Sequence, residues 1–167
     1  NVSSTVTTQE FERNVAPAIA YYQPADGKQG SALKTAMFNI IKTHTTLSYS
    51  NLTTYYEQTD MRSDGKVRDW YSNATAYSFS QSTGSYSKEG DMYNKEHSFP
   101  ASWFGDASPM YSDIVHVIPA DGYVNNRRGN NLLGEVGTAT YTSANGYSKL
   151  GTCATTGYNG TVFEPND

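Results

Sequence analysis

The sequence contains a single cysteine, Cys153, which excludes an intrachain disulfide and a cysteine-based zinc site. Its neighbours in Gly-Thr-Cys-Ala-Thr-Thr-Gly include no cation that would activate the thiol, so we expect an ordinary loop residue. No apolar run approaches the roughly 20 residues that a transmembrane helix needs, which excludes a membrane span. Charged residues make up only 17% of the 167 residues, too few for a typical disordered chain.

Positive charge is scarce in the second half of the chain. Residues 1–90 carry eight acidic and eight basic side chains, whereas residues 91–167 carry eight acidic and four basic ones, Lys95, Arg127, Arg128 and Lys149. A protein that holds nucleic acid mainly by neutralising phosphates shows a basic face, and the sequence displays none. The charge distribution argues against a high-affinity nucleic-acid binder, unless folding assembles a basic surface from distant residues.

The polar character of the chain comes from hydroxyl groups rather than from charges. There are 18 serines, 19 threonines and 14 tyrosines, a composition that resembles many exported bacterial proteins. The first residue, Asn1, is not a natural start, so we expect that a signal peptide or a tag has been removed. These features predict a secreted or periplasmic protein.

The order of the patterned segments predicts one α+β domain over residues 1–167, with helices first. Helical spacing indicates helices over residues 8–24, from a cap at Ser31 onward, and from Ser50 to residue 57. Residues 66–71 have the pattern of a strand, and residues 78–90 that of a Ser/Gly/Tyr-rich loop. After Gly134 the chain is rich in Gly, Thr and Tyr without a helical period, so we expect a compact half of sheet and loops.

The residues best suited to chemistry begin in Tyr93-Asn-Lys-Glu-His-Ser-Phe-Pro-Ala-Ser-Trp-Phe-Gly105, where Glu96 directly precedes His97. Histidine is the natural general base near neutral pH, and a carboxylate is a natural oxygen ligand of a hard cation. Adjacent residues of a regular strand point to opposite faces, so a shared site requires the strand to end or distort, and Pro100 is placed to end it. By itself, such a pair also fits an exposed glutamate beside a packed histidine.

A second segment, Ser112-Asp-Ile-Val-His-Val-Ile-Pro-Ala-Asp-Gly-Tyr-Val-Asn-Asn-Arg-Arg-Gly-Asn130, strengthens the case for a site. It predicts a buried strand over residues 114–118 and then a short helix, with Pro119 in the first turn and Gly129 at the end. Asn125 would lie inside that helix despite its poor propensity, and the offer of its side-chain carbonyl to a metal would explain its presence. Two strands and a helix, with histidine on the first strand and asparagine on the helix, form the layout of a ββα-metal site.

These two segments closely resemble the endonuclease I family of secreted bacterial His-Me finger nucleases. Three further stretches are similar to landmarks of that family: Tyr21-Tyr22, Asp69-Trp-Tyr-Ser72 and Val162-Phe-Glu-Pro165. The resemblance implies a central ββα-metal motif in which His97 is the general base and Glu96 and Asn125 bind one divalent cation. It also implies that Arg128, in Arg-Gly-Asn, holds the phosphate or the end of the helix.

The implied reaction is hydrolysis of phosphodiester bonds in DNA or RNA without sequence specificity. Two oxygen ligands leave a cation with several waters and a place for phosphate, which suits Mg²⁺, with Ca²⁺ or Mn²⁺ as substitutes. Neutral His97 would take a proton from water, so no 2′-hydroxyl is required and 5′-phosphate ends are expected. We expect its second ring nitrogen to donate to a backbone carbonyl on the facing strand, around residues 111–116.

The remaining basic and imidazole side chains carry further expectations. Arg128 is assigned to catalysis and substrate binding, and Arg127 to substrate binding. Of the two, Arg128 is expected to face the substrate and the other arginine to face acidic side chains. His116 is expected to be structural, and no role is assigned to His44. Nucleic acid is the expected partner, and no obligate protein partner is evident.

Two features depart from the family pattern. Many relatives have a His-His pair where this chain has Val115-His116, and relatives continue past the Phe-Glu-Pro motif whereas this chain stops at Asp167. We therefore expect a fragment that lacks the family's C-terminal helices. A noncatalytic surface or adhesion domain on the same scaffold is the alternative, but the retained glutamate, histidine and asparagine argue against it. A carbohydrate-binding module is supported only by the abundance of Tyr and Trp.

Overall fold

A computed structural model describes residues 19–82 and 84–166. Contacts divide the chain into two compact units, residues 1–45 and 46–167, and the single domain stays a prediction. Helices and sheets both occur, which confirms the α+β class. Among the residues described, every helix falls short of the length and apolar character that crossing a bilayer requires.

The described part of the first unit is helical. Residues 19–22 end a helix whose expected beginning, from residue 8, lies outside the described residues, and η1 (Gln23–Ala25) follows. Helix α2 (Gly30–Ile41) confirms the second predicted helix, but its N-cap is Gln29 and no side chain caps it, so the predicted cap at Ser31 is wrong. The hydroxyl of Tyr21 donates to the carbonyl of Ile40 over 3.1 Å and joins the two helical stretches.

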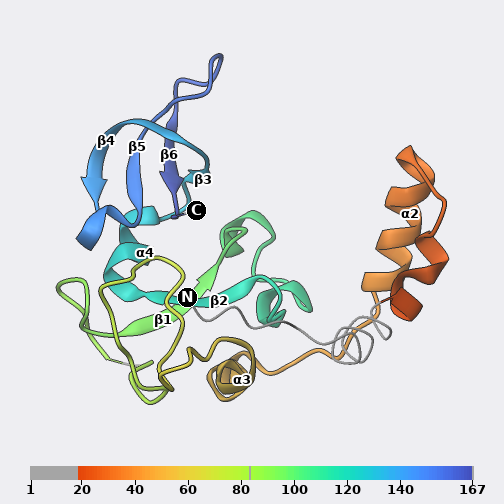
Figure 1. The fold of residues 1–167 in the computed structure, drawn as a ribbon, viewed down its shortest axis with the longest axis horizontal. Helices are drawn as coiled ribbons and strands as arrows, with labels where there is room; N and C mark the ends of the chain where they lie inside the picture. Colours follow the sequence, from red (N-terminus) through yellow and green to blue (C-terminus); the bar gives the residue numbers. More distant parts are fainter. Residues whose placement is uncertain (1–18, 83, 167) are drawn as a thin grey trace, which may run out of the picture. The chain divides into compact units, whose positions relative to one another are not determined.

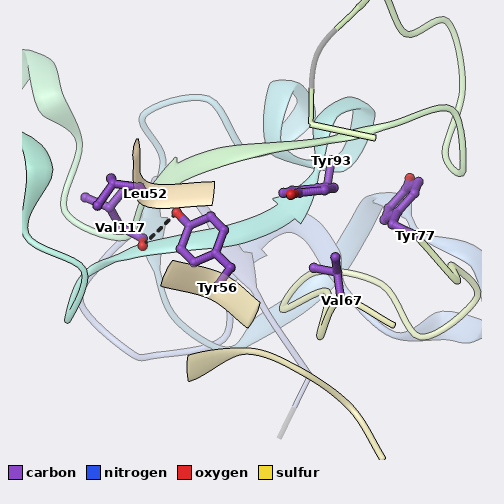
Figure 2. Close-up of a cluster of buried hydrophobic side chains, with 6 residues drawn as sticks. All are labelled: Leu52, Tyr56, Val67, Tyr77, Tyr93 and Val117. Carbon is purple, nitrogen blue, oxygen red and sulfur yellow. Dashed lines mark hydrogen bonds between the residues drawn. The ribbon is translucent and has the colours of Figure 1, made fainter. Parts of the chain in front are cut away.

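The second unit begins with η2 (Tyr49–Asn51) and α3 (Leu52–Thr59), which confirms the third predicted helix. Leu52 and Tyr56 of α3 are fully buried in a cluster completed by Val67, Tyr77, Tyr93 and Val117 (Figure 2). A buried tyrosine needs a partner for its hydroxyl, and Tyr56 donates to the carbonyl of Val117 over 3.0 Å (Figure 2). This bond ties α3 to the strand that carries Val117.

The strand predicted over residues 66–71 is wrong. Only Val67 makes a β contact, an isolated bridge to Met61. Beyond it, one carboxylate oxygen of Asp69 accepts from the backbone N–H groups of Tyr71 (2.9 Å) and Ser72 (3.1 Å), which turns the chain. Aspartate competes for backbone donors in this way and so disfavours a regular ladder. The loop predicted over residues 78–90 is confirmed, since its described residues form no helix or strand.

Strands β1 (Tyr93–His97) and β2 (Val117–Asp121) form an antiparallel pair that leads into α4 (Gly122–Arg128). The prediction of a strand over 114–118 is displaced, because residues 114–116 lie in a turn and Pro119 lies inside β2. Proline is tolerated there because, among the described strands, β2 pairs only with β1, so the missing N–H of Pro119 interrupts no second strand pairing. Asp121 caps the helix by accepting from Val124 N–H over 2.8 Å, and Gly129 ends it at φ +56°, as predicted.

A second sheet contains β3 (Leu132–Leu133), β4 (Val136–Thr142), β5 (Lys149–Cys153) and β6 (Thr161–Glu164), in the order β3-β6-β5-β4. This confirms the predicted sheet-and-loop half, although Cys153 lies in a strand and not in a loop. Helix α4 lies between this sheet and the β1–β2 pair (Figure 1), where Val124 packs with Tyr71, Ala120 and Phe163. The buried face of α4 therefore fixes the helix so that Asn125 and Arg128 face β1.

Candidate active site

The site forms where β1 ends and α4 crosses it. Glu96 and His97, the last two residues of β1, line a cavity of about 310 Å³ together with Asn125 and Arg128 of α4. Glu96 and His97 are both buried, and they belong to adjacent positions whose side chains would diverge on a continuing strand. Both residues border one cavity although they occupy successive positions of β1.

One nitrogen of the His97 ring is committed to the backbone. Nε2 lies 2.9 Å from the carbonyl oxygen of Tyr111, and since a carbonyl only accepts, Nε2 carries the hydrogen. Neutral His97 then has its lone pair on Nδ1. The predicted contact with a carbonyl in residues 111–116 is confirmed, but Tyr111 lies in η4 (Met110–Ser112) and not on the facing strand. Burial lowers the pKa of His97, which favours the neutral ring.

The carboxylate of Glu96 is oriented by two strong donors on the same oxygen. Oε1 accepts from the hydroxyl of Tyr71 over 2.7 Å and from Nη1 of Arg128 over 2.5 Å. Burial raises the pKa of Glu96, whereas Arg128, Tyr71 and the side chain of Asn125 pull it down. Both of these bonds fall on Oε1, so Oε2 is the oxygen that Tyr71 and Arg128 leave accessible.

Asn125 projects from α4 toward the face of β1 that carries Glu96. Its Nδ2 donates to Oδ1 of Asn94 over 2.7 Å, and its side chain also hydrogen-bonds to the carboxylate of Glu96. The side-chain nitrogen is therefore occupied, while the carbonyl oxygen is the end of the amide suited to a cation. Asn94 was missed in the sequence, where its position two residues before Glu96 was the available signal.

Arg128 is 2% exposed and its guanidinium is bound on several sides. Besides Glu96, it donates to the backbone carbonyls of His97 (2.9 Å) and Ser98 (2.7 Å). The sequence predicted that Arg128 faces substrate and its neighbour faces acids; the structure places Arg128 on the acid. Exposed Arg127 instead lies over the ring of Tyr123, 4.9 Å from its centroid. A buried carboxylate attracts the arginine whose helical position faces it, and only the fold determines which one that is.

His116 packs against His97 and is bonded to the backbone. Its Nε2 lies 2.8 Å from the carbonyl oxygen of Met110, and its ring stands edge-on to the ring of His97 with centroids 5.6 Å apart. The ring of Tyr111 stacks on His97 from another side, with centroids 5.1 Å apart. The aromatic packing around His97 restricts the orientation of its ring.

The donor set of the cavity fits a hard cation. Within residues 19–82 and 84–166, no three His, Cys, Asp or Glu side chains gather in a way that could hold a metal ion. A glutamate and an asparagine supply two oxygen donors, too few and too hard for a structural zinc site but compatible with an ion that keeps most of its waters. The chemistry of Glu96 and Asn125 therefore fits Mg²⁺ better than a softer metal.

The comparisons of this chain with known proteins agree with one another. Extracellular ribonucleases of Bacillus amyloliquefaciens and Bacillus subtilis (strain 168) are 34% identical to the chain over 152 and 151 residues. The match covers 88% of this chain and 47% of each relative, so the chain spans about half the length of these relatives. No solved structure matches it. The model of the Endonuclease I family matches residues 29–167, and the chain belongs to this family.

Proposed function

We propose that the chain is a secreted, metal-dependent endonuclease that hydrolyses phosphodiester bonds of RNA and DNA without sequence specificity. The observation that carries the proposal is the 2.9 Å contact between His97 Nε2 and the Tyr111 carbonyl, beside Glu96 and Asn125 in one cavity. This contact leaves Nδ1 as a base whose tautomer is already set. The relatives' description as extracellular ribonucleases supports RNA as a substrate and action outside the cell.

In the proposed reaction, cation binding and proton transfer fall to different residues. Glu96 and Asn125 would hold Mg²⁺, or Ca²⁺ or Mn²⁺ in its place, and such a cation supplies stabilisation of charge on the phosphate and on the departing 3′-oxygen. His97 Nδ1 takes one proton from water as its oxygen bonds to phosphorus and the bond to the 3′-oxygen breaks. The 3′-oxygen takes a proton from solvent, which leaves a 5′-phosphate and a 3′-hydroxyl. Because the attacking oxygen comes from water, DNA and RNA are both suitable.

The two arginines take different parts in this proposal. Arg128 holds Glu96 in place and joins the end of α4 to the end of β1, so it acts through Glu96. Arg127 is exposed one residue earlier on the same helix, and we assign it a phosphate contact outside the cavity. With so few other basic side chains near the site, nucleic acid should be held weakly.

The decisive experiment compares His97→Ala with the parent on RNA and duplex DNA, with Mg²⁺ and with EDTA. Loss of a positioned base should slow cleavage by about a hundredfold or more, while Mg²⁺ binding measured by calorimetry stays close to that of the parent. His44→Ala is the matched control, because this histidine lies in the first unit and has no assigned role. Cleavage by His97→Ala at the parent rate would remove His97 as the base, and parent cleavage that resists EDTA would remove the metal. A folded parent that cleaves neither nucleic acid with any of the three cations would favour the noncatalytic surface domain.

A further inference from the structure

Asn94 and Glu96 share one face of β1. They are two positions apart on a regular strand, opposite Ala120 and Ile118 of β2, so their side chains project to the same side. Both line the cavity, and α4 crosses that face with Asn125 above them. Asn94 and Glu96 of β1 therefore form one group with Asn125 of α4.

The orientation of the Asn125 amide decides whether it can bind a hard cation. An amide has one oxygen that can ligate and one nitrogen that cannot, because the nitrogen lone pair is delocalised. The two ends have nearly the same shape, so a half-turn of the side chain exchanges them. Nδ2 of Asn125 donates to Oδ1 of Asn94 over 2.7 Å, and this bond is lost if the Asn125 amide turns over while that of Asn94 keeps its orientation.

We infer that Asn94 is a positioning residue that holds the amide of Asn125 with its oxygen free for the cation. In this arrangement β1 supplies a ligand at Glu96 and, two residues earlier, the acceptor that orients the other ligand. Partners that orient metal ligands usually change metal affinity by about ten- to a hundredfold when they are removed. The inference rests on the proposed metal site and adds a residue to it.

The test measures Mg²⁺ and Mn²⁺ affinity by calorimetry on the full chain without nucleic acid. Asn94→Leu keeps the size of the side chain and removes the acceptor, so affinity should fall about ten- to a hundredfold. Asn94→Asp can only accept from Nδ2 and should bind the ion at least as tightly as the parent. Urea unfolding in EDTA checks that each variant folds, and Asn94→Ala replaces Asn94→Leu if leucine prevents folding.

Repeating the substitution in an Asn125→Asp protein separates a loss of amide orientation from a general disturbance of the site. Asn125→Asp gives a carboxylate with two equivalent oxygens, so either oxygen can ligate the cation and no partner is needed to orient the group. In this background Asn94→Leu should change affinity by less than threefold. An equal loss in both backgrounds, or no loss in the parent, would overturn the role of Asn94. If the parent binds no ion, or Glu96→Gln binds it as well as the parent, the proposed metal site itself fails.

Discussion

Replacing Arg128 by methionine removes the guanidinium and keeps an apolar stem of similar length. The arginine is 2% exposed and the carboxylate of Glu96, 2.5 Å from its Nη1, belongs to a residue that is 4% exposed. The substitution therefore leaves a buried charge without its cation and the carbonyls of His97 and Ser98 without this donor. Breaking a buried pair by removing one partner costs about 3–5 kcal/mol, and we expect a loss of that size in the free energy of unfolding near pH 7.

The loss should depend on pH in a defined direction. Burial raises the pKa of Glu96, and Arg128 is the strongest influence that lowers it. Without the arginine, the folded-state pKa of Glu96 rises further, so the deficit is complete above that pKa. The deficit in stability shrinks as the pH falls through the pKa of Glu96 in the variant, because protonated Glu96 no longer carries an unpaired charge.

Urea unfolding followed by circular dichroism, in EDTA and across pH, measures both effects. Arg127→Met is the matched control, and because Arg127 is exposed we expect a change within about 0.5 kcal/mol. Adding Glu96→Gln to Arg128→Met should recover part of the loss, since the double variant buries no charge at this position. A loss below about 1 kcal/mol, or a loss that is the same at every pH, would refute the role of Arg128 as the partner of a buried charge.

Tyr71→Phe removes the 2.7 Å hydrogen bond to Glu96 while keeping the ring, and Mg²⁺ affinity measured by calorimetry should fall by up to about tenfold; an unchanged affinity would show that this hydroxyl does not orient Glu96. Burial raises the pKa of Asp69 to about 6 from 3.8, so its contribution to stability is present below pH 3.8 and is lost as the pH rises through about 6. This amounts to about 3 kcal/mol, and an Asp69→Asn protein that keeps the same pH dependence in urea unfolding would contradict the assignment. Arg127→Ala should reduce the slope of log affinity against log salt by about one, measured for a short duplex in the His97→Ala background, and an equal slope would take Arg127 out of substrate binding.

The sequence alone brought Glu96 and His97 together, because they are consecutive in the chain. Glu96 and His97 are adjacent on one strand, so both residues border a single cavity. Asn125 was singled out by a local conflict, a poor helix former inside a helix, and α4 confirms that placement. The helix end at Gly129 was predictable for the same reason, since a left-handed residue after a helix favours glycine.

Only the tertiary structure decided how distant residues share the site. The shift of β2 from 114–118 to Val117–Asp121 follows from its pairing with β1, which no local pattern records. Tyr71 comes from a segment whose predicted strand is replaced by a turn around Asp69, and this turn accompanies the approach of its hydroxyl to Glu96.

Which of the two arginines is buried and which is exposed could likewise not be predicted from the sequence. Arg127 and Arg128 are adjacent and chemically identical, and they differ only in which side of α4 each occupies. Packing of Val124 against Ala120 and Phe163 sets the rotation of that helix about its axis. Adjacent helical residues point in directions about 100° apart, so that rotation turns Arg128 toward the buried carboxylate and leaves Arg127 at the surface.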